Sequence, residues 1–262
     1  MNTLEIRNLT AGYGRKKIWE NLSLTLRGGE ITVLLGRNGC GKTTLLRAVQ
    51  GSLPAMEGSI FVNGTDLGGL SVRQRAALVT TMPQKIPDAE GLTGMEYLKM
   101  GFYPTKGPFA GLTDTDRLRI TEKAVPFGAS GLLYRDLSEM SMGERQMLSL
   151  LRAELQDTPV LLLDEPASAL DFGHTAELFA MLKTLAAKGK CILAVLHDPT
   201  MALRYGTRLL CLDRGGCFAD LSVAGTPPEE MESALRKLYP TLRLHTDPVF
   251  CWSEDRQDGY RI

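Results

Sequence analysis

Two kinds of apolar pattern follow one another along the first part of the chain. Residues 4–9 (LEIRNL) and 22–26 (LSLTL) place an apolar side chain at every second position, which predicts half-buried strands of an antiparallel sheet. Residues 30–36 (EITVLLG) form a nearly continuous apolar run, which predicts a central parallel strand that is covered on both faces. A helix is expected over 42–50, and a further strand over 59–64.

The second half of the chain returns to buried strands after a long helical stretch. Strand-like apolar runs cover 160–166 and 191–198 with a helical pattern between them, whereas helical and turn-rich patterns fill about 86–158. Strands that alternate with helices predict an α/β core, a mostly parallel sheet with helices on both faces. We therefore expect this core together with an N-terminal antiparallel β subdomain and an inserted helical subdomain within residues 1–225, and a C-terminal extension over 226–262 with one short helical piece.

Composition and charge narrow the class of protein. The 262 residues are 44% apolar and 23% charged, which is typical of a folded globular chain. Lys and Arg total 30, as do Asp and Glu, so a nucleic-acid partner is not expected. No apolar stretch approaches the roughly 20 residues that span a bilayer, and Glu5 lies where a signal peptide needs an apolar core. The 5 scattered cysteines contain no CxxC pair, and we expect a cytosolic protein.

The most specific motif lies between the predicted strand at 30–36 and the helix at 42–50. Residues 36–43 read Gly-Arg-Asn-Gly-Cys-Gly-Lys-Thr, the spacing of a phosphate-binding loop. Glycines let the backbone wrap closely around phosphates, Lys42 would neutralise the β- and γ-phosphates, and Thr43 would ligate Mg²⁺. Lys42 and the helix N-terminus are also expected to lower the pKa of the Cys40 thiol. The predicted nucleotide contacts are Gly36, Asn38, Gly39, Cys40, Gly41, Lys42, Thr43 and Thr44.

Acidic residues and a histidine follow the next two buried runs. Asp164 is placed to hold Mg²⁺ directly or through water, and Glu165 to polarise an attacking water. His197 would lie at the sheet edge where ligands bind in α/β folds, and it could hold the water and Glu165 in line. From the residues alone, Asp-Glu-Pro could simply end a strand, and a histidine at a strand end is usually structural. Gln84 could reach Mg²⁺ or the water, or neither.

Taken in order, these motifs resemble the ATP-binding subunit of ATP-binding-cassette (ABC) transporters over residues 2–225. The resemblance implies a P-loop NTPase core, ATP and Mg²⁺ as cofactors, and two copies paired head to tail. It also implies that Tyr13 stacks on adenine, although Tyr13 could instead be an ordinary edge-strand aromatic. Gln84 matches the glutamine loop that senses nucleotide and faces the membrane subunits. Asp171 matches the loop that crosses the dimer interface, and His197 matches the switch histidine.

Residues 140–144 (Met-Ser-Met-Gly-Glu) occupy the place of the family signature, usually Leu-Ser-Gly-Gly-Gln. Ser141 followed three residues later by Glu144 is also a capping box, and the two interpretations are compatible because a helix N-terminus binds anions. The resemblance implies that Ser141, Gly143 and Glu144 meet the ATP held by the other copy. Met142 replaces the first glycine. We expect it to be the first helical residue, where it costs little, rather than a positive-φ residue that would weaken closure on ATP.

The resemblance implies an ATPase that powers import through transmembrane permease subunits at the cytoplasmic face of the membrane, with a substrate-binding protein in the full system. Residues 67–84 and 92–109 are similar to the iron–siderophore, haem and cobalamin importer branch. Importers of metal ions or amino acids share the same core and stay open as alternatives. So do a soluble cassette ATPase without a transport role and an interaction module that binds nucleotide without hydrolysis. The presence of Glu165 and His197 argues against a module that binds nucleotide without hydrolysis.

Overall fold

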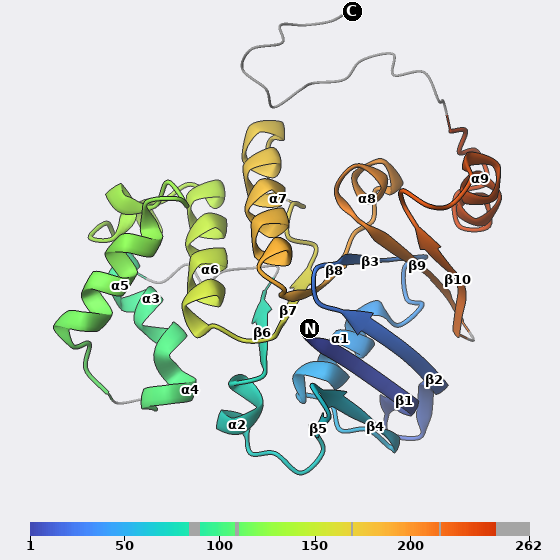
Figure 1. Ribbon diagram of the computed structural model, residues 1–262, viewed down its shortest axis with the longest axis horizontal. Coiled ribbons are helices and arrows are strands. Elements are labelled where there is room, and N and C mark those ends of the chain that lie inside the picture. Colours follow the sequence, from blue (N-terminus) through green and yellow to red (C-terminus); the bar gives the residue numbers. More distant parts are fainter. Residues whose placement is uncertain (84–89, 108–109, 169, 215, 245–262) are drawn as a thin grey trace, which may run out of the picture.

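The computed structural model describes residues 1–83, 90–107, 110–168, 170–214 and 216–244. Their strands form two sheets, with a mostly helical lobe to one side (Figure 1). The N-terminal sheet has the order β2-β1-β4-β5, and the core sheet has the order β10-β9-β3-β8-β7-β6. The strands are β1 (Thr3–Tyr13), β2 (Lys16–Arg27), β3 (Ile31–Gly36), β4 (Glu57–Val62), β5 (Thr65–Asp66), β6 (Val79–Met82), β7 (Val160–Asp164), β8 (Cys191–Val195), β9 (Arg208–Asp213) and β10 (Gly216–Ser222).

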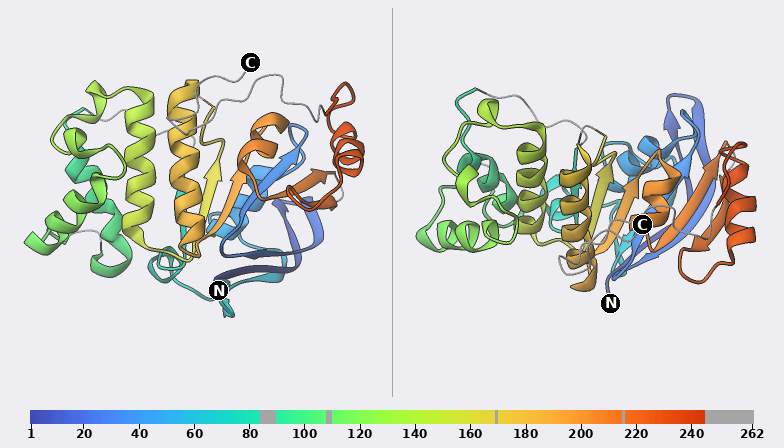
Figure 2. Two further views of the ribbon diagram at one scale, coloured as in Figure 1. Left: turned by 45° about the horizontal axis from the view of Figure 1, so that its top comes forward. Right: turned by 90° about the horizontal axis from the view of Figure 1, so that it is seen from above.

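The helices divide between the core and the helical lobe, which contains α3 to α6 (Figures 1 and 2). In the described ranges, no helix has the length and apolar character to cross a membrane. The helices are α1 (Lys42–Gln50), α2 (Val72–Ala76), α3 (Gly94–Lys99), α4 (Tyr103–Lys106), α5 (Asp114–Ala124), α6 (Met142–Gln156), α7 (Phe172–Ala187), α8 (Pro199–Tyr205) and α9 (Pro228–Arg236), with 3₁₀ turns at Met100–Phe102, Ser130–Leu132 and Leu137–Glu139.

The N-terminal sheet confirms the predicted antiparallel subdomain. Strand β1 pairs antiparallel with both β2 and β4, and its alternate residues Leu4 and Ile6 are buried. They share one apolar cluster with Leu45 and Val49 of α1 and with Leu34 of β3. Helix α1 is therefore packed between the two sheets, which fixes the loop at its start from both sides.

The core sheet places the ends of three parallel strands at one edge. In β8, Val195 lies opposite Leu34 of β3 and opposite Asp164 of β7. These strands are buried along nearly their whole length, as their continuous apolar runs predicted. The segments after β7 and β8 consequently begin at the same level, and β3 continues two residues further, to Gly36, at the same edge of the sheet. This register is the basis of the site described below.

Strand β6, helix α2 and helix α8 are among the elements that the apolar pattern did not anticipate. Strand β6 has four residues, VTTM, which is too short to show an alternation, yet it pairs in parallel with β7. Helix α2 (VRQRA) has no buried residue, and its start is set by a capping box between Ser71 and Gln74. Helix α8 begins where the Asp198 side chain accepts the Thr200 N–H at 2.7 Å. Local capping and strand pairing, rather than hydrophobic periodicity, define these elements.

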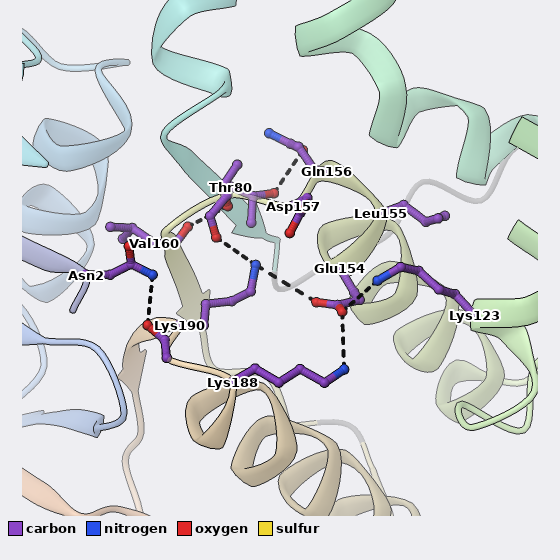
Figure 3. Close-up of polar contacts among 12 residues, drawn as sticks. Asn2, Thr80, Lys123, Glu154, Leu155, Gln156, Asp157, Val160, Lys188 and Lys190 are labelled. Carbon is purple, nitrogen blue, oxygen red and sulfur yellow. Dashed lines mark hydrogen bonds and ion pairs between the residues drawn. The ribbon is translucent and has the colours of Figure 1, made fainter. Parts of the chain in front are cut away.

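A buried carboxylate joins the helical lobe to the core. The side chain of Glu154, on α6, is 7% exposed and accepts a 2.8 Å hydrogen bond from Lys123 of α5. Lys188 and Lys190, in the turn between α7 and β8, place their ammonium groups 3.6 and 4.0 Å from the same carboxylate (Figure 3). Lys190 also donates to the Thr158 carbonyl at 2.7 Å. Burial lowers the pKa of Lys190, and the charge of Glu154 opposes that shift.

Glu154→Gln should lower the free energy of unfolding by about 3 kcal/mol, because it removes the carboxylate that compensates a buried lysine. Chemical denaturation at neutral pH measures this. The loss should shrink as the pH rises through the lowered pKa of Lys190, because the neutral amine no longer needs a counter-charge. The control is Glu177→Gln, on an exposed face of α7, which should change stability by less than about 0.5 kcal/mol. Equal effects of the two substitutions would contradict the account.

Candidate nucleotide-binding site

The loop between β3 and α1 needs glycine for steric reasons at several positions. A Cβ on Gly36 would lie 2.7 Å from the Leu212 carbonyl oxygen. Gly39 and Gly41 have backbone φ angles of 76° and 109°, in the left-handed region that favours glycine. A Cβ on Gly41 would also lie 2.8 Å from the Trp19 ring, whose Nε1 donates to the Gly41 carbonyl at 2.9 Å. Trp19, which the sequence interpretation missed, therefore fixes this loop from the N-terminal sheet.

Lys42 is held by the backbone of its own loop. Its ammonium donates to the carbonyls of Gly36 at 2.7 Å and Arg37 at 3.3 Å. In front of the loop lies a hollow with a volume of about 570 Å³. Most of the predicted phosphate contacts meet there with both residues predicted to act on water. The lining residues are Ile18, Asn38, Gly39, Gly41, Lys42, Thr43, Thr44, Glu165, Val195 and His197.

The expectation of an acidified Cys40 thiol was wrong. Cys40 is 3% exposed and belongs to the apolar cluster behind the loop. Burial raises the pKa of its thiol, and the nearby charge of Lys42 only partly opposes this. Desolvation outweighs the favourable charge because the side chain faces the core rather than the hollow.

Glu165 and His197 line the hollow, and Asp164 lies close to both of them and to Thr43. Burial raises the pKa of Asp164, the charge of Glu165 raises it further, and a hydrogen bond from the Thr43 side chain opposes both. Glu165 has a backbone φ of 50°, an uncommon conformation for a non-glycine residue that costs on the order of 1 kcal/mol. One Glu165 carboxylate oxygen, Oε1, lies 2.5 Å from His197 Nε2. The structure thus pairs the two residues that the sequence interpretation expected to hold a water.

Tyr13 lies apart from this pair, on the N-terminal sheet. Tyr13 ends β1, is 46% exposed, and its hydroxyl accepts a hydrogen bond from Arg47 of α1 at 3.0 Å. A hydrogen bond with the Thr44 side chain lowers the pKa of Tyr13, so its ring lies near the first turn of α1. Its role in stacking on adenine stays a prediction. Gln84 lies outside the described residues, and its predicted role stays a prediction as well.

The signature segment forms the predicted helix cap. Ser141 is the N-cap of α6, and Met142 is the first helical residue, as expected. The Glu144 N–H donates to Ser141 Oγ at 3.2 Å, and the Ser141 N–H donates to the Glu144 carboxylate at 2.8 Å. The latter bond is the main reason why the pKa of Glu144 is lowered, and Arg135, at 2.7 Å, adds to the effect. Met142 consequently costs little at this position.

The start of α6 packs against the first turn of α7, the helix that Asp171 caps. A Cβ on Gly143 would lie 2.6 Å from His174 Cδ2, so a larger residue at this position would force the His174 ring to move. His174 Nδ1 lies 2.8 Å from the Asp171 carboxylate. Gln146 also donates to the Pro166 carbonyl at 2.8 Å, next to Glu165 in the chain. The sequence interpretation missed His174, although its position three residues after the N-cap Asp171 was a usable signal.

One chain does not complete the phosphate site with its own signature segment. Of the residues that the structure describes, neither Ser141 nor Gly143 lines the hollow around Lys42. Helix α7 lies between α6 and strands β7 and β8 of the core sheet in each view (Figures 1 and 2). The start of α6 instead leaves Ser141 and Met142 exposed to solvent. This geometry leaves the signature segment available to another molecule.

Comparisons with known proteins agree with this arrangement. The sequence model of the family described as "ABC transporter" matches residues 19–168. The achromobactin transport ATP-binding protein CbrD of Dickeya dadantii (strain 3937) is 34% identical over 254 residues, which cover 95% of this chain and 93% of that protein. The iron(3+)-hydroxamate import ATP-binding protein FhuC of Bacillus subtilis (strain 168) is 33% identical over 216 residues, which cover 82% and 80%.

The fold has a close counterpart among solved structures. The ADP conformation of an ATP-binding cassette of an ABC transporter superposes with a TM-score of 0.80, at 20% identity, over 92% of this chain and 100% of that one. This likeness confirms the predicted P-loop NTPase core with its N-terminal antiparallel sheet. The family match and the two relatives confirm the resemblance on which the functional expectation was built. The chain belongs to the ABC transporter family, in which it is an ATP-binding subunit and an ATPase.

Proposed function

We propose that this ATPase hydrolyses ATP at sites shared by two copies of the chain, and that it thereby drives import of a metal chelate of the iron–siderophore, haem or cobalamin type. The observation that carries the proposal is the contact of Glu165 with His197 at the mouth of the hollow formed by the phosphate-binding loop. A carboxylate held by an imidazole beside a phosphate site is suited to orient water for in-line attack.

Each of the site residues has a different role in the proposed hydrolysis. Glu165 accepts a hydrogen bond from the attacking water, and His197 holds the carboxylate in the required direction. Lys42 exchanges the carbonyls of Gly36 and Arg37 for phosphate oxygens, where its charge stabilises the transition state. Gln84 is proposed to add a contact to the water or the metal from the start of the helical lobe.

A magnesium site is proposed to accompany this arrangement. Across the part of the chain that the structure describes, no group of three His, Cys, Asp or Glu side chains could hold a metal. The hydroxyl of Thr43 and the carboxylate of Asp164 nevertheless share a hydrogen bond and supply two adjacent oxygen donors. This donor set fits Mg²⁺, which takes few protein ligands and keeps water and phosphate oxygens. Mg²⁺ held there would neutralise phosphate charge.

A second copy is proposed to supply the remaining half of each site. The start of α6 presents Ser141, the Gly143 N–H and the helix dipole, which together suit a γ-phosphate. To reach it, the Ser141 hydroxyl must turn away from Glu144, whose charge Arg135 continues to neutralise. Asp171, which caps α7 and contacts His174, is proposed to lie at the interface between the copies.

Permease subunits are proposed to dock beside the Gln84 segment, at the cytoplasmic face of the membrane. A second hollow, of about 570 Å³, is lined by Pro83, the residue before Gln84 in the chain, together with Val72, Tyr103 and Arg152. Arg73 connects its two sides by donating to the carbonyls of Pro104 at 2.8 Å and Thr105 at 2.6 Å. A hollow with apolar and cationic groups at its rim suits a short helix of a membrane subunit.

The substrate class is supported by the relatives rather than by the nucleotide site. CbrD is named for achromobactin transport, and FhuC for iron(3+)-hydroxamate import. The segments 67–84 and 92–109 carry the same branch resemblance. A substrate-binding protein would deliver the chelate to the permease subunits in the full system. Uptake of labelled ferric siderophores by cells with and without this chain tests the assignment.

Glu165→Gln should reduce the steady-state rate of ATP hydrolysis by at least about 100-fold, because the amide cannot act as a base towards water. Binding of ATP should be retained, since Glu165 does not hold the nucleotide. Light scattering should then show a dimer that forms with MgATP, and a further Ser141→Arg change should abolish it. Undiminished hydrolysis by the Glu165→Gln variant would contradict the assignment of the base.

Asp164→Asn should raise the melting temperature of the nucleotide-free protein while removing the effect of Mg²⁺ on ATP affinity. The raised pKa of Asp164 means that its ionised form is disfavoured in the folded state, so the native carboxylate lowers stability at pH values above that pKa. In the native protein, Mg²⁺-dependent ATP binding should weaken as the pH falls towards the raised pKa. Calorimetry and titrations with and without Mg²⁺ measure both effects. A variant with unchanged Mg²⁺ dependence would exclude Asp164 as a ligand.

A further inference from the structure

The C-terminal segment packs against the core next to the nucleotide site. Helix α9 lies beside β10 and near α8 (Figures 1 and 2). Its Met231 and Leu235 are buried, as is Leu238 after the helix, in an apolar cluster that also contains Leu209 of β9 and Leu221 of β10. The sequence interpretation found a short helical piece here and no role for it. The packing gives the segment after α9 a fixed position.

Two polar contacts extend from this segment to the two loops that form the site. The Tyr239 hydroxyl donates to the backbone carbonyl of His197 at 2.8 Å. The Arg37 guanidinium, from the phosphate-binding loop, donates to the Lys237 carbonyl at 3.3 Å. The same Arg37 residue offers its own carbonyl to the ammonium of Lys42. Residues two positions apart in the C-terminal segment therefore contact both the phosphate loop and the His197 loop.

The carbonyl that Tyr239 contacts belongs to a short connection between two fixed elements. β8 ends at Val195, and Asp198 already caps α8, so His197 lies in a turn rather than in the sheet or a helix. Its imidazole must nevertheless stay 2.5 Å from Glu165, whose own backbone is strained. Burial raises the pKa of Tyr239 to about 12, so its hydroxyl remains a donor at any working pH.

We propose that Tyr239 is a positioning residue for ATP hydrolysis: its hydroxyl holds the peptide of His197 so that the imidazole stays against the Glu165 carboxylate. The proposal rests on the proposed function, because it assigns Tyr239 to the same pair of residues. The Arg37 contact serves the same purpose on the phosphate side. The C-terminal segment is thus a part of the hydrolytic apparatus and not a separate extension.

The test compares two substitutions that each remove one tyrosine hydroxyl that donates a hydrogen bond. Tyr239→Phe deletes the donor to His197, whereas Tyr97→Phe deletes a 3.2 Å hydrogen bond to Ser149 inside the helical lobe. With rates measured well below both melting transitions, Tyr239→Phe should lower kcat roughly tenfold and leave KM for ATP within about twofold. Tyr97→Phe should leave kcat at the wild-type value.

A double substitution separates positioning from general destabilisation. In a His197→Ala background, Tyr239→Phe should cause no further loss of kcat, because the residue that it positions is gone. Additive losses would overturn the proposal, as would a Tyr239→Phe variant that hydrolyses ATP as fast as Tyr97→Phe. Either result, with Glu165→Gln still inactive, leaves the proposed function standing. Full activity of the Glu165→Gln and His197→Ala variants would overturn the proposed function instead.

Discussion

The parallel register of β3, β8 and β7 is the constraint on which the candidate site depends. Val195 lies opposite both Leu34 and Asp164, so the carboxyl ends of the three strands lie at the same edge of the sheet. The loop after β3 is the phosphate-binding loop, the loop after β7 carries Glu165, and the loop after β8 carries His197. A shift of one strand by a single residue would reverse the faces of its side chains and separate the Glu165–His197 pair. The continuous burial of these strands is what holds the register in place.

Several features of the site are unfavourable in the isolated chain and suited to a ligand. Burial raises the pKa of Asp164, which disfavours its charged form, and Glu165 is held at a positive φ. Each of these costs would be relieved or put to use by a metal and phosphates. When no ligand is bound, the apolar packing of α1 between the two sheets offsets these energetic costs. The free energy of folding thus maintains a site whose groups are already arranged to bind a metal ion and phosphates.

The sequence predicted those parts of the molecule whose causes are local. Helix α1 begins and ends where expected because Gly41 and Gly51 adopt left-handed conformations at its two ends, and the cap at Ser141 was visible from Glu144 three residues later. The pKa of Cys40 was predicted in the wrong direction because burial depends on residues distant in the chain. The roles of Trp19 and Tyr239 were missed for a related reason, since each contacts a partner that is distant in the chain. The contact of His174 with Gly143 is also distant in the chain, although the position of His174 after Asp171 was a local signal.

Whether each site is shared between two copies is decided most directly by mixing two inactive variants. Lys42→Ala removes the phosphate-binding charge, and Ser141→Arg blocks the signature segment. In a mixed dimer, one site combines the intact phosphate loop of the second variant with the intact signature of the first. We predict that hydrolysis reappears on mixing, up to roughly a quarter of the wild-type rate if the copies pair at random. A mixture as inactive as its folded components would contradict a site built from two copies.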